Sequence, residues 1–148
     1  VSLHAPNDRL RESLMPLNKK YPISLLLDAC RRYVEKSPKR QEIFVEYTLL
    51  KGVNDGYEHA KELSLILKGL SCKINLIPFN PISGSTFKQP SVRRVREFQS
   101  TLVKNGYSVT VRTTRGNDIA AACGQLAGRL VDQTTSRPKH KEIKLENI

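Results

Sequence analysis

The stretch IFVEYTLL, residues 43–50, predicts a β-strand because β-branched and aromatic residues fill it. The strand is expected to be largely buried, which makes the charged Glu46 in its middle unusual. A second strand is predicted over residues 73–80, KINLIPFN, where apolar and polar residues alternate. Pro78 is placed at the exit of this strand, because proline cannot donate a hydrogen bond to a strand ladder.

Two helices are predicted beside these strands by apolar residues that recur at helical spacing. The first covers residues 23–34 and ends at Ser37-Pro38, because the residue before proline disfavours the helical conformation. Its apolar positions are Leu26, Cys30, Tyr33 and Val34. The second starts with Asp55 and Glu58 as a capping-box-like pair and stops near Gly69. Its inward residues are expected to be Ala60, Leu63, Ile66 and Leu67.

A third helix is predicted from a cap at Ser91 to about Asn105. Its buried stripe is expected to be Val92, Val95, Phe98 and Leu102. Three arginines lie off that stripe: Arg93, Arg94 and Arg96. They are either an ordinary solvated face or a surface that contacts phosphates.

Two further strands complete the predicted order. Residues 1–5 alternate weakly before a turn at residues 6–8, and residues 107–112 form the last strand. Strands that alternate with helices predict an α/β fold with a parallel sheet and right-handed crossovers. Ligands bind such folds at the carboxyl ends of the strands. Those ends are His4, Leu50, Phe79-Asn80 and the loop after Arg112.

The chain is strongly basic, with 25 Lys and Arg against 14 Asp and Glu and a formal net charge of +11. Nucleic acid is therefore the first candidate partner, because neutralised phosphates release counterions. An anionic membrane surface is the second candidate and is not favoured. A spanning helix needs roughly 20 apolar residues, and no apolar run in the sequence approaches that length.

The three cysteines, Cys30, Cys72 and Cys123, are odd in number and fit no C-x-x-C pattern. This favours a reducing cytoplasm over a disulfide framework. Cys30 lies on the apolar side of a helix and Cys72 just before a strand, so both are interpreted as structural. Cys123 is flanked by alanines and a glycine, which leave room for a bulky substrate to reach the sulfur. A small buried side chain and a reactive thiol both remain open for it.

Two polar residues at strand ends have open interpretations. His4 is either a surface or capping histidine or a cofactor contact, and Asn80 either starts a turn or binds a ligand through its amide. No metal site is predicted, because His4, His59 and His140 lack the spacing of metal ligands and the cysteines form no cluster.

Three segments together resemble one family: VSLHAPND at residues 1–8, KINLIPFNP at 73–81 and RTTRGNDIAAACGQLAG at 112–128. They are similar to the dual-specificity ribosomal and transfer RNA adenine-C2 methyltransferases, the RlmN-like radical S-adenosylmethionine enzymes. The resemblance runs from residue 1 to about residue 130 in the family's order. It implies a partial (βα) barrel of the radical S-adenosylmethionine type, of which this chain is expected to be the C-terminal part.

By position, Ser2, Leu3, His4 and Asn80 match residues of that family that bind S-adenosylmethionine, and Cys123 matches the cysteine that becomes S-methylated. The resemblance implies that one S-adenosylmethionine methylates Cys123 and that a [4Fe–4S] cluster cleaves a second to a 5′-deoxyadenosyl radical. That radical takes hydrogen from the methyl group, and the resulting carbon radical adds to C2 of adenine. A second cysteine then resolves the adduct. The implied partners are 23S rRNA, tRNA and an electron donor for the cluster, in the cytoplasm.

The main departure from the family is that the chain lacks the cluster-binding C-x-x-x-C-x-x-C triad and the part with the resolving cysteine, and neither Cys30 nor Cys72 matches these positions. We therefore expect a fragment that does not catalyse alone. A smaller departure is Asn117, where the family has an acidic residue. Residues 1–131 are expected to belong to the methyltransferase domain, and residues 132–148 to form a basic, flexible tail. Two alternatives stay open. One is a relative that methylates C8 of adenine, and the other is a non-catalytic, basic RNA-binding module.

Overall fold

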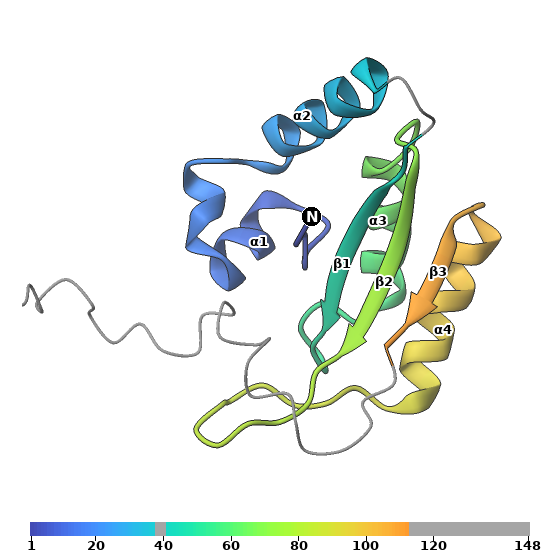
Figure 1. The fold of residues 1–148 in the computed structure, drawn as a ribbon. Helices are drawn as coiled ribbons and strands as arrows, with labels where there is room; N and C mark the ends of the chain where they lie inside the picture. Colours follow the sequence, from blue (N-terminus) through green and yellow to red (C-terminus); the bar gives the residue numbers. More distant parts are fainter. Residues whose placement is uncertain (38–40, 113–148) are drawn as a thin grey trace, which may run out of the picture.

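The fold is an α/β arrangement around a parallel sheet (Figure 1). A computed structural model describes residues 1–37 and 41–112. Within them, β1 (Ile43–Leu49), β2 (Cys72–Pro78) and β3 (Ser108–Val111) lie side by side in that order, all parallel. The predicted first strand is reduced to one parallel bridge between Ser2 and Glu46, on the open side of β1. The expected fold class is confirmed.

Five helical segments surround the sheet. The predicted ones are α2 (Ile23–Lys36), α3 (Tyr57–Ile66) and α4 (Val92–Lys104). The sequence patterns missed α1 (Asp8–Leu14) and the short 3₁₀ helix η1 (Pro16–Lys19). Residues 6–8 were expected to be only a turn. Instead Asn7 caps α1, because its side-chain oxygen accepts a hydrogen bond from the N–H of Leu10 at 2.9 Å.

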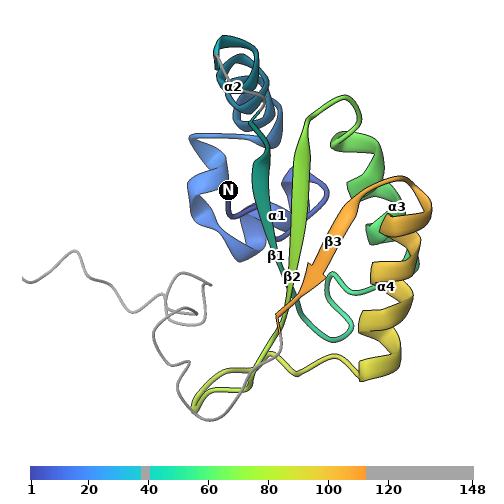
Figure 2. The same cartoon turned by 45° about the vertical axis from the view of Figure 1, so that its right-hand side comes forward.

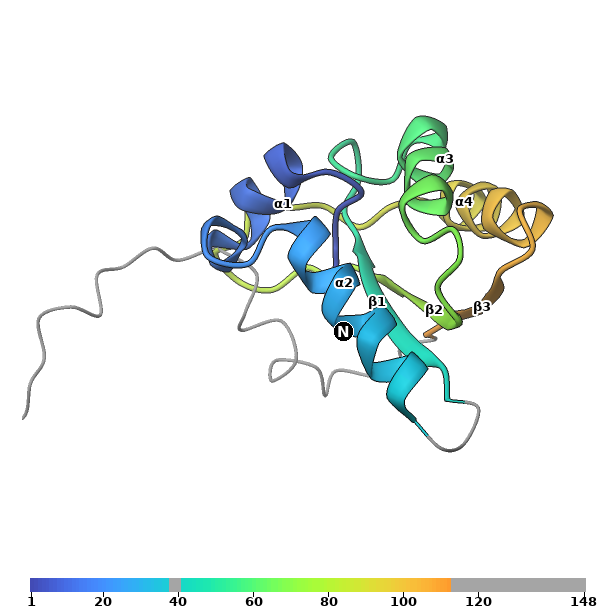
Figure 3. The same ribbon diagram turned by 90° about the horizontal axis from the view of Figure 1, so that it is seen from above.

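One face of the sheet carries the main core, because α3 and α4 lie side by side along it (Figures 2 and 3). The strand residues that point to this face are buried. They are Val45, Tyr47, Leu49, Ile74 and Leu76. The ring of Tyr47 lies 5.3 Å from that of Phe98 of α4, centroid to centroid. α2 adds Ile23, Leu27 and Cys30 to the same core from the β1 side.

A second, smaller apolar cluster lies at the carboxyl ends of the strands. It consists of Ala5, Leu14, Met15, Leu50 and Phe79. Phe87, from the loop after β2, contacts Phe79 edge-on with ring centroids 6.1 Å apart. This cluster holds α1 and the loop under the end of the sheet where ligands bind in such folds.

Two expectations about apolar stripes were wrong. Tyr33 is 56% exposed, because α2 packs through Ile23, Leu27 and Cys30, with the predicted Leu26 and Val34 at the margin of the same stripe. Val92 is 68% exposed, because it is the first residue of α4.

The predicted capping box of α3 was also wrong. Gly56 is the N-cap, and the carboxylate of Asp55 accepts a hydrogen bond from the N–H of Gly52 in the preceding loop at 2.9 Å. The imidazole of His59 accepts the N–H of Gly56 at 3.2 Å. None of the helices in the described ranges combines the length and apolar character that a bilayer crossing requires.

Candidate functional site

A row of polar side chains crosses the face of the sheet opposite α3 and α4. Its members lie at one level in the strand register: Ser2 beside Glu46, Glu46 beside Asn75, and Asn75 beside Thr110. The Ser2 hydroxyl donates to a Glu46 carboxylate oxygen at 3.4 Å, and the Thr110 hydroxyl donates to the Asn75 amide oxygen at 3.1 Å. Parallel sheets are usually apolar on both faces. We call this set the polar row.

The sequence analysis marked Glu46 as unusual, but it did not predict that Asn75 would lie beside Glu46 or that Thr110 would lie beside Asn75. The missing information was register, because cross-strand pairs are set by tertiary structure. Alternation of apolar and polar residues in all the strands was the available signal.

His4 lies at the carboxyl edge, next to Thr48 of β1. Its imidazole Nδ1 accepts the Thr48 N–H at 3.0 Å, and its backbone has a φ of 57°, in the left-handed region. The residue is 8% exposed, and burial lowers the pKa of its imidazole to about 4, although the nearby Glu46 opposes this. A neutral ring that accepts at Nδ1 carries its proton on Nε2. His4 is therefore a buried histidine with one N–H left to offer, not a surface group.

Asn80 lies at the same edge of the sheet as His4. Ile77 is the register partner of Thr48, which His4 contacts, and Asn80 follows shortly after Ile77. Asn80 is half-buried. The prediction that both residues lie at the carboxyl edge is confirmed, and Arg112, exposed after β3, lies there too, with its N–H bonded to the carbonyl of Leu76 at 2.8 Å.

Ser2 and Leu3 precede His4 and differ in what they present. Ser2 is half-buried and belongs to the polar row. The side chain of Leu3 is fully buried in the main core, and its N–H bonds to the carbonyl of Glu46 at 3.0 Å. Its carbonyl accepts a buried hydrogen bond from the Arg11 guanidinium at 3.1 Å, so Leu3 fixes the backbone, whereas Ser2 offers a hydroxyl.

The three cysteines divide into two that the structure describes and one that it does not. Cys30 and Cys72 are buried free thiols. Burial raises the pKa of Cys30, and burial and Glu42 raise the pKa of Cys72 to about 11. Both thiols are thus protonated at neutral pH and unsuited to nucleophilic chemistry. Cys123 and the segment 113–148 lie outside the described residues.

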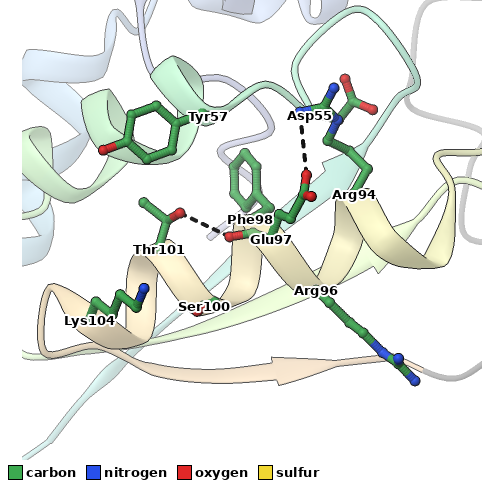
Figure 4. Close-up of a pocket in the computed structure, with 9 residues that line it drawn as sticks. All are labelled: Asp55, Tyr57, Arg94, Arg96, Glu97, Phe98, Ser100, Thr101 and Lys104. Atoms are coloured by element: carbon green, nitrogen blue, oxygen red, sulfur yellow. Dashed lines mark hydrogen bonds and ion pairs between the residues drawn. The ribbon is translucent and has the colours of Figure 1, made fainter.

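The arginine-bearing helix faces away from the polar row. Glu97 pairs with Arg93 at 2.8 Å and with Arg94 at 3.6 Å, so two of the three arginines have an acidic neighbour. A hollow of about 410 Å³ lies between this helix and the start of α3, bordered by Asp55, Glu97 and Lys104 among others (Figure 4). Its lining mixes both charges, which does not single out an anionic ligand.

Metal-ligating side chains do not gather in the part of the chain that the structure describes: no three of His, Cys, Asp and Glu lie close enough there to hold an ion. Carboxylate, amide, hydroxyl and imidazole groups converge on one edge and one face of the sheet.

Comparison with known proteins gives consistent results. No family model matches the chain. The dual-specificity RNA methyltransferase RlmN of Marinobacter nauticus is 54% identical over 147 residues, which is 99% of this chain. The proteins of the same name from Marinomonas sp. and Pseudomonas fluorescens are 56% and 50% identical over 97% of the chain. The chain spans about 40% of the length of these relatives.

Two solved structures are similar as well. A radical SAM methyltransferase from Sphaerobacter thermophilus has a TM-score of 0.78 and 51% identity over 87% of this chain and 37% of its own. A domain of pyruvate-formate lyase-activating enzyme from Bacteroides vulgatus has a TM-score of 0.59 over 76% of this chain and 65% of its own. At 20% identity, this second likeness concerns the fold alone.

Proposed function

We propose that this chain, which is similar over nearly its whole length to the RlmN-like RNA methyltransferases, is part of a radical S-adenosylmethionine enzyme that methylates C2 of adenine in 23S rRNA and tRNA. The observation that carries the proposal is identity of 50–56% over at least 97% of the chain to proteins of that name. The parallel sheet and its likeness to a radical SAM methyltransferase support the same conclusion.

In this proposal, Ser2, Leu3, His4 and Asn80 hold S-adenosylmethionine. Support comes from the position of His4 and Asn80 at the carboxyl edge, where ligands bind in parallel α/β folds, and from the Ser2 hydroxyl in the adjoining polar row. The polar row fits a nucleoside and an amino acid group, because it supplies acceptors at Glu46 and amide and hydroxyl groups beside it. Bound there, S-adenosylmethionine supplies the methyl group and, with a [4Fe–4S] cluster held by the rest of the full-length protein, the radical chemistry.

Cys123 is proposed as the methyl carrier. C2 of adenine is not nucleophilic, so it cannot accept a methyl group by direct polar transfer. A methyl group carried on sulfur can instead be converted to a carbon radical that adds to C2. The two buried thiols are unsuited to the role, since their pKa values are raised. In the full-length protein, Cys123→Ala should abolish RNA methylation, and mass spectrometry of the wild type should find a methyl mark on the peptide that contains Cys123.

Cys30→Ala is the matched control. It removes a buried thiol and should cost stability of about 1–3 kcal/mol without removing product formation. Normal methylation by Cys123→Ala would overturn the proposed mechanism. Digestion of the methylated RNA identifies the product as 2-methyladenine or 8-methyladenine, and the latter would assign the chain to the C8-methylating alternative.

RNA binding is proposed to rest mainly on charge, because the chain carries a net charge of +11. The logarithm of affinity should then fall linearly with the logarithm of salt concentration. The slope of this salt dependence should become less steep on each substitution that removes a phosphate contact. The substitutions to test are Arg93→Gln, Arg94→Gln and Arg96→Gln. Salt-independent affinity would contradict the proposal. A non-catalytic RNA-binding module would show the same salt slope but no methyl mark on Cys123.

The proposal also includes an electron donor for the cluster and a location in the cytoplasm. An electron donor must reduce the cluster, and a reducing cytoplasm suits both the cluster and the free thiols. Reduction of the cluster in the purified full-length enzyme by an added one-electron donor, followed by cleavage of S-adenosylmethionine, would test the first. Fractionation of cells tests the second.

A further inference from the structure

The segment Ser2 to His4 has few backbone partners: the N–H groups of Leu3 and His4 share the Glu46 carbonyl, at 3.0 and 3.4 Å, and no backbone N–H of the described residues donates to its three carbonyls. It forms a single bridge with β1 instead of a ladder, and it ends in a left-handed conformation that residues other than glycine rarely adopt. A segment of this kind needs other contacts to stay in one conformation. Two buried side chains supply them.

Arg11 of α1 is one of these side chains. It is 3% exposed, and its guanidinium donates to the carbonyl of Leu3 at 3.1 Å and to that of Ser2 at 3.2 Å. The same group donates to the Asn18 side chain at 2.7 Å and to the carbonyl of Tyr21 at 3.0 Å, which fixes its own position. The planar fork of an arginine suits two adjacent carbonyls, whereas a lysine offers a single point of charge.

Asn54, in the loop after β1, is the other. It is fully buried, and its amide nitrogen donates to the carbonyl of His4 at 2.9 Å and to that of Thr48 at 2.7 Å. Its amide oxygen accepts the N–H of Leu50 at 2.7 Å. Both the nitrogen and the oxygen of the Asn54 side-chain amide are thus hydrogen-bonded. They link the end of the Ser2–His4 segment to the end of β1.

Three successive carbonyls, those of Ser2, Leu3 and His4, therefore accept hydrogen bonds from two buried side chains that come from different elements. The Thr48 N–H bond to the His4 imidazole adds a fourth fixed point. Resting on the function proposed above, we infer that Arg11 and Asn54 are positioning residues that hold the Ser2–His4 segment in its cofactor-binding conformation before the cofactor arrives.

Neither residue needs to touch the cofactor in this scheme. Their carbonyl contacts direct the Ser2 hydroxyl toward the polar row and leave Nε2 of His4 as the donor at the edge. Residues that orient the binding groups in this way change affinity although they lie behind them. The inference adds Arg11 and Asn54 to the residues that determine cofactor affinity.

The first test compares two variants of the full-length holoenzyme with a control. Arg11→Lys and Asn54→Ala should each raise the Kd for S-adenosylmethionine by about tenfold. The KM for S-adenosylmethionine should rise in parallel, whereas turnover at saturating cofactor should stay near that of the wild type. Tyr107→Phe is the control. It removes another bond from a side chain to a carbonyl, that of Tyr107 to Ser64 at 2.7 Å, at the opposite end of the sheet.

The control separates positioning from general stability. Tyr107→Phe should lower the thermal midpoint but leave the Kd within about twofold of the wild type, because distant sites act independently. Unchanged Kd values in both variants, or an equal rise in the control, would overturn the inference. A wild-type holoenzyme that fails to bind S-adenosylmethionine would instead contradict the proposed function.

The second test needs no variant and checks one part of the inference, namely that the segment is fixed before the cofactor arrives. Hydrogen exchange at the Leu3 amide should be slow in the wild-type holoenzyme without S-adenosylmethionine, because the segment is already fixed. Addition of S-adenosylmethionine should change that rate little. Fast exchange that becomes slow only on cofactor addition would show that the cofactor orders the segment, and would overturn the inference.

Discussion

The two faces of the sheet differ sharply although they share the same strands. On the face under α3 and α4, Val45, Tyr47, Ile74 and Leu76 are all at most 1% exposed. On the other face, the residues that alternate with them include Glu46 and Asn75, with Phe44 63% exposed at the amino end. The comparison teaches that one face stabilises the fold and the other is available for binding. Substitutions on the two faces should therefore have separable effects.

The largest effect on stability is expected from the helix-covered face. Phe98→Ala should lower the free energy of unfolding by about 3–5 kcal/mol, because it removes a fully buried ring that contacts Tyr47. Urea unfolding of the full-length protein measures it. Thr110→Ala, an exposed change on the polar face, is the control and should change little. A loss of the same size in both would remove the distinction between the faces.

The next effect concerns His4, at the edge of the polar face. Its pKa is lowered from 6.5 to about 4, so the unfolded state binds the proton more readily. Above pH 6.5 the imidazole is neutral in both states and contributes no penalty. Between pH 6.5 and about 4 the folded state should lose roughly 3 kcal/mol of stability on this account.

Urea unfolding at a series of pH values measures this loss. The control is His4→Asn, which keeps a hydrogen-bonding side chain that tolerates the left-handed backbone and removes the titrating group. The difference in unfolding free energy between wild type and variant should shrink as the pH falls through this window. A difference that is independent of pH would refute the assignment of a buried, neutral His4.

A smaller effect on stability is expected from the polar row itself. Glu46→Gln keeps the shape of the side chain, and the hydroxyl bond from Ser2 is long at 3.4 Å, so the free energy of unfolding should change by less than about 1 kcal/mol. The Kd for S-adenosylmethionine should nevertheless rise. Joint unfolding and binding measurements on the full-length protein check this. A stability loss as large as that of Phe98→Ala would make Glu46 structural.

The smallest effect is expected on the solvated side of α4. Arg93→Gln breaks an i,i+4 pair with Glu97 in which the arginine side chain is 88% exposed, and such pairs add little to stability. The thermal midpoint should stay the same within error, at low and at high salt. A salt-dependent drop would show that this pair contributes more to the fold than surface pairs generally do.

Much of the architecture was predictable because it rests on local patterns. β1 and β2 were predicted almost to the residue, and α2, α3 and α4 were each found. α1 was missed because only Leu10 and Leu14 of its short span are apolar, too few to establish a helical repeat. In the predicted stripe of α2, Cys30, Leu26 and Val34 do contact the core and only Tyr33 was wrong, because a helix with apolar residues on several sides leaves one of them outward.

The site was predictable only in part. Resemblance to a family pointed to Ser2, Leu3, His4 and Asn80, and topology accounts for the common edge of His4 and Asn80. Nothing local marks Arg11 or Asn54, because their partners are backbone carbonyls from distant parts of the chain. A buried arginine bonded to carbonyls has the same sequence signature as a solvated one. Cys123 lies outside the described residues, so its role stays a prediction.

The parallel register also has a consequence for how the chain folds. Neighbours across the sheet are far apart in sequence, 44 residues for Ser2 and Glu46 and 35 for Asn75 and Thr110. Such contacts form only after long loops have closed, and proteins rich in them fold slowly. The helices, whose contacts are local, are expected to form first. During synthesis, the Ser2–His4 segment leaves the ribosome before β1, so it has no strand partner until β1 follows, and until then the apolar side chain of Leu3 is exposed to other chains.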